Sequence, residues 1–193
     1  SGMDLEAMDA GVFVTKTASG TVVEDNTIVD NLYGIYLHGA VDSVARGNRI
    51  SGLREGRMND AGNGVSVWNA PGARVMDNDI SFGRDGIFII ASKRNVFSRN
   101  RFSHVRFAIH YMYTDDSEVS DNVSIGNSVG YAIMYSNRLK ITGNVSDGDR
   151  DHGFLFNYAN GSEIARNTVF GRLQPSSRWT SAGRQVGTHG VPT

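Results

Sequence analysis

The stretch GIFIIASKRNVFSRN, residues 86–100, decides the fold, because its pattern recurs along the chain. A small residue opens the stretch, apolar residues follow at alternate positions, and an asparagine closes it. Windows of the same length and pattern occupy residues 34–48, 64–78, 108–122, 130–144 and 153–167. Self-similarity at a fixed period of this size is typical of solenoids, in which each repeat packs only on its neighbours.

The recurring asparagines set the period of the repeat. They are Asn26, Asn48, Asn78, Asn100, Asn122, Asn144 and Asn167. Successive asparagines are 22 or 23 residues apart, except for one interval of 30 that we ascribe to an eight-residue insertion. Asparagine tolerates the left-handed backbone of a tight corner, and its amide can bond to the asparagine of the next coil. We therefore expect these residues to form a structural ladder.

Short apolar alternations separated by Gly, Asn, Asp and Ser predict strands, not helices. A leucine-rich repeat has a similar period, but leucine is scarce at the repeated positions here. The pattern predicts an all-β protein: a right-handed parallel β-helix with about 22 residues and three short strands per coil. We expect the coils to span 21–171, with the insertion 53–60 (LREGRMND) at one corner. Residues 1–20 are expected to be a cloning remnant and a partial coil, and 172–193 a non-repeating tail that caps the solenoid or is disordered.

Composition excludes several functional classes. The 193 residues suffice for one domain, and 23 glycines against 3 prolines favour a regular structure with many tight corners. Because 19 basic residues balance 20 acidic ones, a dedicated nucleic-acid binder lacks its electrostatic basis. The absence of cysteine excludes disulfides, thiolate nucleophiles and cysteine-ligated metal sites. No apolar run has the length of a membrane-spanning helix, so we expect no direct membrane insertion.

The loops, as well as the strands, resemble those of a known family. The resemblance rests on GIYLHGAVDSVARGNRISGLREGRMNDAGNGVSVWNAPGARVMDNDISFGRDGIFI (34–89), FAIHYMYTDDSEVS (107–120), GYAIMYS (130–136) and GDRDHGFLFNYANGS (148–162). These stretches resemble the NosD proteins, β-helix components of the machinery that matures nitrous oxide reductase. The resemblance implies a periplasmic location and delivery of copper to the reductase. It also implies four partners: the ATPase and membrane subunits of an ABC transporter, a copper chaperone and the reductase.

The strand alternation also identifies an outward face. Positions 13 and 11 before each asparagine are expected to point inward, so positions 12 and 10 before it point outward. The outward residues are Tyr36, Ser66, Phe88, His110, Ala132 and Leu155 in one column and His38, Trp68, Ile90, Met112, Met134 and Asn157 in the other. A solvated face would carry Thr, Lys, Glu and Ser, whereas this face is mostly apolar and includes two histidines and two methionines.

Two methionines and a histidine on this face suit a soft metal. Met112 and Met134 fall in adjacent coils, about 4.8 Å apart, and His110 lies two residues before Met112. Thioether and imidazole groups suit Cu(I) in a protein without cysteine. We therefore predict that copper, as Cu(I), binds at His110, Met112 and Met134, with His38, Met58 and His152 as second-tier candidates.

The residues alone favour a plainer interpretation, in which a loop or a partner covers this face and the methionines fill gaps. With the family resemblance taken into account, copper binding is as well supported as this plainer interpretation, and the two interpretations are compatible. We predict partner docking on Trp68, Phe88 and Ile90, together with Arg57, Met58 and Asp60 of the insertion. Tyr113, Tyr135 and Tyr158 share one position in consecutive coils and are expected to stack.

The competing class is a polysaccharide-active enzyme, either a uronate lyase or epimerase or a glycoside hydrolase, because β-helices host such activities. Such an enzyme needs carboxylates at a defined separation, and no acid pair repeats on one outward face. Arg84–Asp85 and the corresponding segment 149–152 are better explained as salt-bridged turns. We expect a non-enzymatic delivery protein without catalytic residues. A purely structural solenoid is disfavoured because no flat threonine-rich face is present.

Overall fold

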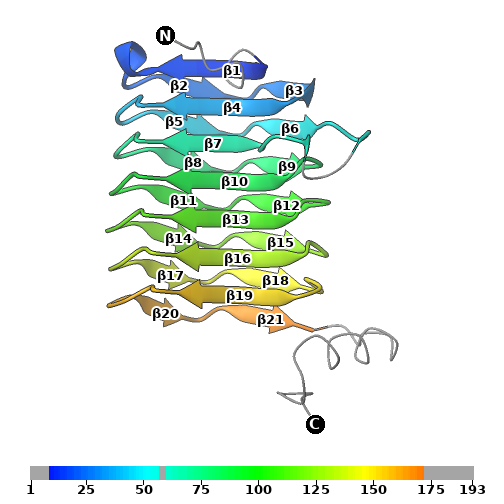
Figure 1. Ribbon diagram of the computed structural model, residues 1–193, viewed down its shortest axis with the longest axis vertical. Helices are drawn as coiled ribbons and strands as arrows, with labels where there is room; N and C mark the ends of the chain where they lie inside the picture. Colours follow the sequence, from blue (N-terminus) through cyan, green and yellow to red (C-terminus); the bar gives the residue numbers. More distant parts are fainter. Residues whose placement is uncertain (1–8, 57–59, 172–193) are drawn as a thin grey trace.

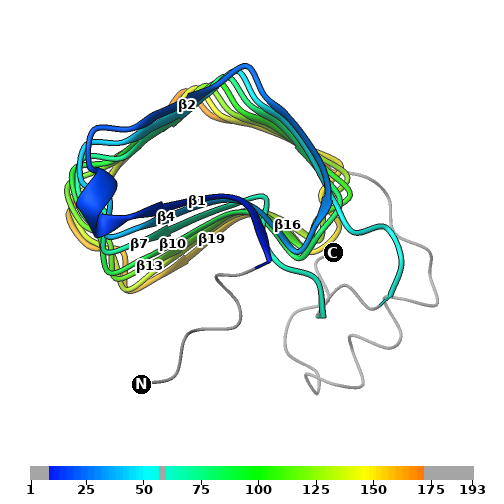
Figure 2. The ribbon, with the colours of Figure 1, turned by 90° about the horizontal axis from the view of Figure 1, so that it is seen from above.

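The computed structural model describes residues 9–56 and 60–171, which stack as the coils of a parallel β-helix (Figure 1). Each coil contributes one strand to each of three seven-stranded sheets, and every strand pair is parallel. Viewed along the stack, the coils superimpose and surround a common interior (Figure 2). The predicted all-β parallel β-helix is therefore confirmed.

The first sheet contains most of the longest strands and lies in front in Figure 1. Its strands, in spatial order, are β1 (Ala10–Thr15), β4 (Tyr33–His38), β7 (Val65–Trp68), β10 (Asp85–Ile90), β13 (Phe107–Met112), β16 (Val129–Met134) and β19 (His152–Asn157). A short 3-10 helix, η1 (Lys16–Ala18), follows β1. The structured coils thus begin inside the segment 1–20.

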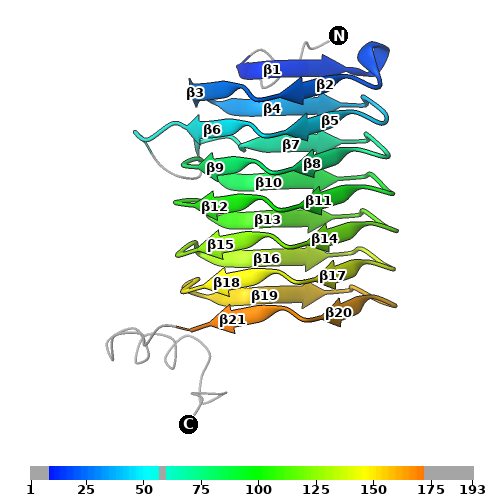
Figure 3. The ribbon, with the colours of Figure 1, turned by 180° about the vertical axis from the view of Figure 1, so that it is seen from behind.

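The second and third sheets have shorter strands and are seen from behind in Figure 3. The second sheet contains β2 (Val22–Glu24), β5 (Val44–Arg46), β8 (Arg74–Met76), β11 (Val96–Ser98), β14 (Glu118–Ser120), β17 (Lys140–Thr142) and β20 (Glu163–Ala165). The third contains β3 (Thr27–Asn31), β6 (Arg49–Gly52), β9 (Asp79–Ser81), β12 (Arg101–Ser103), β15 (Val123–Ile125), β18 (Val145–Asp147) and β21 (Thr168–Phe170).

The interior is filled by the inward positions of all three sheets. The two predicted inward columns of the first sheet are fully buried from β4 to β16, and they consist of Ile35, Leu37, Val65, Val67, Ile87, Ile89, Ile109, Tyr111, Tyr131 and Ile133. β-Branched and aromatic side chains suit a pleated buried surface, and each one removed from water contributes about 1.5–3 kcal/mol. Phe97 and Phe102 are the largest side chains that the other two sheets bury completely. The hydrophobic effect therefore holds neighbouring coils together.

The asparagine ladder forms as predicted, from Asn26 to Asn167. Each side-chain oxygen accepts from the backbone N–H and the side-chain amide of the asparagine one coil earlier, at 2.9–3.1 Å. From Asn48 onward, the amide also donates to a backbone carbonyl of the preceding coil, as Asn100 does to Val75. From Asn48 to Asn144, the backbone N–H and the side-chain amide of each ladder asparagine are thus satisfied within the solenoid.

One detail of the corner differs from the prediction. The left-handed backbone belongs to the residue before each asparagine, such as Asp77 or Arg99, and not to the asparagine itself. Two corners use Gly47 and Gly143 for this turn, since glycine adopts positive φ without steric cost. The asparagine is therefore selected for its amide group and not for its backbone conformation.

The predicted insertion falls in the connection between the third and first sheets, which the chain enters after β6 ends at Gly52 and leaves where β7 begins at Val65 (Figure 1). Residues 57–59 and the tail 172–193 lie outside the described residues. At the last coil Ile164, Val169 and Phe170 are exposed.

Candidate functional site

The outer face of the first sheet carries the two columns that the alternation predicted. One column runs in register through Phe13, Tyr36, Ser66, Phe88, His110, Ala132 and Leu155. The other runs through Thr15, His38, Trp68, Ile90, Met112, Met134 and Asn157. Most of these side chains are half-buried against one another, and Trp68 is 39% exposed. The face is thus a packed apolar surface that remains partly open to solvent.

Met112 and Met134 are direct neighbours on this face. They end β13 and β16 and pair in register, and both side chains are half-buried. Adjacent strands lie about 4.8 Å apart, so two flexible thioethers that leave the sheet on the same side can approach one ion. The structure therefore brings together the two methionines that the sequence placed together.

His110 lies in the neighbouring column but is less open than the alternation suggested. Only 9% of the residue is exposed, and the rings of Phe88 and Phe107 both lie 5.0 Å from its imidazole, centroid to centroid. Its Nδ1 is 3.0 Å from Oδ2 of Asp85. Its Nε2 is buried and makes no hydrogen bond with any residue in the described ranges.

Asp85 is the residue of this site that sequence analysis missed. It begins β10, is completely buried, and receives two hydrogen bonds from Arg106, at 2.9 and 2.8 Å. Burial alone raises the pKa of Asp85, but the hydrogen bonds from His110 and Arg106 outweigh burial and leave the pKa below its usual value. Asp85 is therefore ionised. Its salt-bridged turn was predicted, but its contact with His110 was not.

A signal for Asp85 was present in the sequence. Asp85 stands two positions before Ile87, so by the strand alternation it belongs to an inward column. Phe107 and Val129 occupy the same position in the next two coils and pair in register with it. A charged residue at a position that the alternation predicts to be inward must find buried partners, which marks it as a candidate for a special role.

The two second-tier histidines lie away from this site. His38 lies in β4, three strands from β13, and its ring stacks on Trp68 at 4.3 Å beside a hollow of about 580 Å³. His152 is exposed at the start of β19 and pairs with Val129. Of the insertion residues, Asp60 is exposed, whereas Arg57 and Met58 lie outside the described residues.

A tyrosine stack borders the methionines. Tyr113, Tyr135 and Tyr158 are exposed, and their rings stack at centroid distances of 5.2 and 5.0 Å, as predicted. All three have positive φ, a conformation that is costly for a bulky residue. Tyr113 directly follows Met112, and Tyr135 directly follows Met134. The stack thus forms one edge of the outer face.

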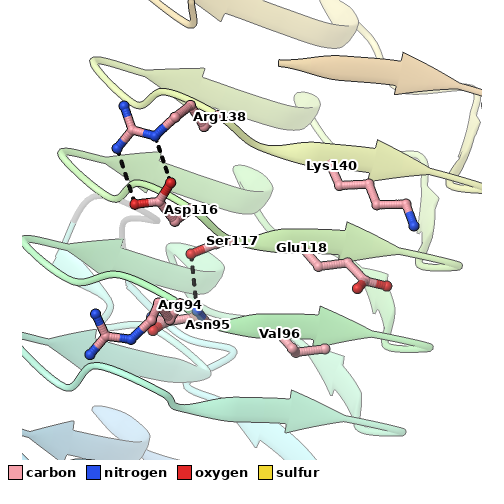
Figure 4. Close-up of a pocket in the computed structure, with 8 residues that line it drawn as sticks. All are labelled: Arg94, Asn95, Val96, Asp116, Ser117, Glu118, Arg138 and Lys140. Carbon is pink, nitrogen blue, oxygen red and sulfur yellow. Dashed lines mark hydrogen bonds and ion pairs between the residues drawn. The ribbon is translucent and has the colours of Figure 1, made fainter. Parts of the chain in front are cut away.

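The outer face of the second sheet has a different character. A hollow of about 460 Å³ lies there among charged and polar side chains (Figure 4). Arg138 points to Asp116 and donates two hydrogen bonds to it, at 2.6 and 3.0 Å. The side chains that line this hollow include no thioether and no imidazole.

Across residues 9–56 and 60–171, no group of three or more His, Asp or Glu side chains is arranged to hold a metal ion. Within the same ranges, no helix has the length and apolar character that crossing a membrane requires.

Comparison with known proteins identifies the family. Residues 53–184 match the family model described as "Periplasmic copper-binding protein (NosD)". A relative from Stutzerimonas stutzeri, named as a probable ABC transporter binding protein NosD, is 37% identical over 168 residues, which are 87% of this chain and 38% of the relative. A relative of the same name from Pseudomonas aeruginosa is 38% identical over 170 residues, 88% of this chain and 40% of the relative. The chain thus spans about two fifths of the length of these curated relatives. The matched span and these identities show that the chain belongs to the NosD family of periplasmic copper-binding proteins.

Proposed function

We propose that this chain holds Cu(I) in transit on the outer face of the first sheet and passes it between partner proteins. The observation that carries the proposal is the in-register pair Met112–Met134, with His110 in the adjoining column. The family's description as copper-binding supports it. In this role copper is cargo that the protein must both bind and release.

The donor set fits this cargo. Thioethers and imidazole are ligands for Cu(I), which accepts two or three donors without a rigid geometry. The buried Nε2 of His110 has no hydrogen-bond partner among the described residues, so a metal bond would satisfy it. A site without thiolate and with half-buried methionines also suits an ion that must be released to an acceptor.

We further propose that the same face docks the partners. A donor or acceptor of the ion must touch the surface that holds it, and Trp68, Phe88 and Ile90 lie in the two columns of that surface. The curated relatives are named as ABC transporter binding proteins, which supports an ATPase and a membrane subunit as partners. A copper chaperone as donor and nitrous oxide reductase as acceptor complete the proposed route.

A binding role is preferred to the polysaccharide-active alternative because the nearby carboxylates serve the fold. Asp115 and Asp116 both pair with Arg138. Asp149 accepts hydrogen bonds from Ser124 and from the backbone of Asn127. Carboxylates engaged in this way are not available as a general acid and base across a sugar.

The test is an anaerobic Cu(I) titration against a competing chromophoric chelator. We expect the double variant Met112→Leu with Met134→Leu, and separately His110→Ala, to lose at least about tenfold in affinity, or about 1.4 kcal/mol. Met76→Leu is the matched control, since Met76 is a half-buried methionine that ends β8 on the second sheet.

Zn²⁺ is expected to compete poorly because thioethers are not among its usual ligands. If all variants bind Cu(I) as tightly as the parent, the site lies elsewhere, and His38 and His152 are the next residues to test.

A further inference from the structure

The cluster around Asp85 contains more than a salt bridge. Its carboxylate receives the two hydrogen bonds of Arg106 and the contact from Nδ1 of His110, and Nε of Arg84 lies 3.9 Å away. A completely buried carboxylate requires compensating partners of this kind. Arg106 already binds both oxygens of Asp85, with the two-bond geometry that Arg99 has on the exposed Asp77. The contact from His110 is therefore additional to a complete arginine–carboxylate pair.

The hydrogen bond determines which ring nitrogen carries the proton. Both oxygens of Asp85 accept hydrogen bonds from Arg106, so the carboxylate acts as an acceptor, and Nδ1 of His110 is the donor. In a neutral imidazole the lone pair then lies on Nε2. This tautomer follows from the hydrogen-bond network and not from an observed hydrogen position.

The free lone pair has no other use in the structure. Nε2 is buried between aromatic rings and accepts no hydrogen bond from any residue the structure describes. An unpaired buried acceptor is unfavourable, and such exceptions in a native protein call for an explanation. A soft metal ion is a partner that an imidazole lone pair accepts without a further hydrogen-bond donor.

The position of Asp85 along the strand is consistent with this explanation. Asp85 pairs in register with Phe107, three residues before His110, whereas Met112 lies two residues after His110. Along the strand direction, the backbone positions of Asp85 and Met112 thus lie on opposite sides of His110. A contact between Asp85 and Nδ1 therefore leaves Nε2 as the ring nitrogen available to an ion held with the methionines.

We propose that Asp85 is a positioning residue for the copper site, which holds His110 in the orientation and tautomer that present Nε2 to the ion. The proposal rests on the function proposed above. Arg106 keeps the carboxylate in place by donating to both of its oxygens. Partners of this kind for metal-binding histidines typically change metal affinity by about 10–100-fold when they are removed.

The test first uses the protein without copper. Long-range proton–nitrogen NMR spectra of a ¹⁵N-labelled sample at mildly alkaline pH report the tautomer of each of the five histidines, and a His110→Gln variant identifies the His110 signals. We expect the Nδ1–H form in the wild type and a mixture or the Nε2–H form in Asp85→Asn. Asp77→Asn is the matched control because it removes the carboxylate of an arginine pair without a histidine, and it should leave the tautomer unchanged.

The second readout is Cu(I) affinity by chelator competition. We expect Asp85→Asn to weaken binding by about tenfold or more, and Asp77→Asn to have no effect.

An Nε2–H form in the wild type overturns the proposal, even if Asp85→Asn fails to fold. An Asp85→Asn variant with unchanged tautomer and unchanged Cu(I) affinity also overturns it. If the tautomer follows Asp85 but neither Asp85→Asn nor His110→Ala changes Cu(I) affinity, the ligand role of Nε2 is overturned together with the proposed metal site. A separate result, in which His110→Ala weakens binding and Asp85→Asn does not, overturns only the positioning role.

Discussion

The asparagine corner and the outer face of the first sheet belong to the same coils but follow opposite patterns. At the corner, each coil repeats the same residue, and each asparagine makes the same hydrogen bonds. On the outer face, the column that contains His110 changes residue from each coil to the next. Coil geometry imposes the first pattern and leaves the second free, so the residues of the outer face are not fixed by the fold and can carry the proposed function.

The largest effect is expected at the corner. Asn100→Ala removes hydrogen bonds to Asn78, Asn122 and Val75 and leaves buried groups without partners. Each such group costs about 1–3 kcal/mol, so we expect the free energy of unfolding to fall by about 3 kcal/mol or more. Denaturant unfolding followed by circular dichroism measures the loss. The matched control, Asn157→Ala, changes an exposed asparagine on the outer face and should cost less than about 0.5 kcal/mol. Equal losses in the two variants would remove the distinction between the regions.

A second, smaller loss is expected at a glycine where neighbouring coils approach each other closely. A Cβ at Gly86 would clash with the ring of Phe102 and with the backbone carbonyl of Ala108. Because a backbone carbonyl cannot rotate away, Gly86→Ala should cost about 1–3 kcal/mol in the same unfolding measurement. Gly171→Ala is the control, since nothing lies within 4 Å of a Cβ at that position. A fully stable Gly86→Ala would show that the spacing between coils is not fixed by this column.

The outer face should tolerate changes that conserve volume. Met112→Leu together with Met134→Leu keeps the half-buried apolar surface, so we expect the free energy of unfolding to change by less than about 1.5 kcal/mol. The same variant is expected to lose Cu(I) affinity, and the two measurements together separate packing from binding. A large loss of stability would instead show that these methionines are needed for packing, as expected if they only fill gaps in a covered face.

The smallest effect concerns the exposed side of the corner. Arg99 donates two hydrogen bonds to Asp77, which lower the pKa of that carboxyl below its usual value. A carboxylate with a lowered pKa stabilises the fold above its unfolded-state pKa, and this contribution is lost as pH falls through the folded-state pKa. Because the pair is exposed, Arg99→Gln should cost only about 0–1 kcal/mol at neutral pH, and the difference from wild type should vanish in acid. Unfolding curves across this pH range test both points. A difference that persists in acid would exclude the ion pair as its cause.

Much of the site was predictable because it follows from register. Once the period of 22 and the alternation are known, Met112 and Met134 must be neighbours on an outward column. The stacking of Tyr113 on Tyr135 follows from the same argument. The openness of His110 was not predictable, because it depends on how the rings of Phe88 and Phe107 pack around it.

The sequence by itself determined the solenoid, its corner ladder and the residues of each face, since a strict repeat fixes which positions stack at the spacing of parallel strands. Only the tertiary structure decided that Asp85 meets His110. These residues are 25 positions apart and occupy different columns. Their contact therefore depends on the direction of two side chains and on the room that Arg106, which also binds Oδ2 of Asp85, leaves for the imidazole. Periodicity specifies where a Cβ lies, but the orientation of a buried ring is set by its neighbours from other coils.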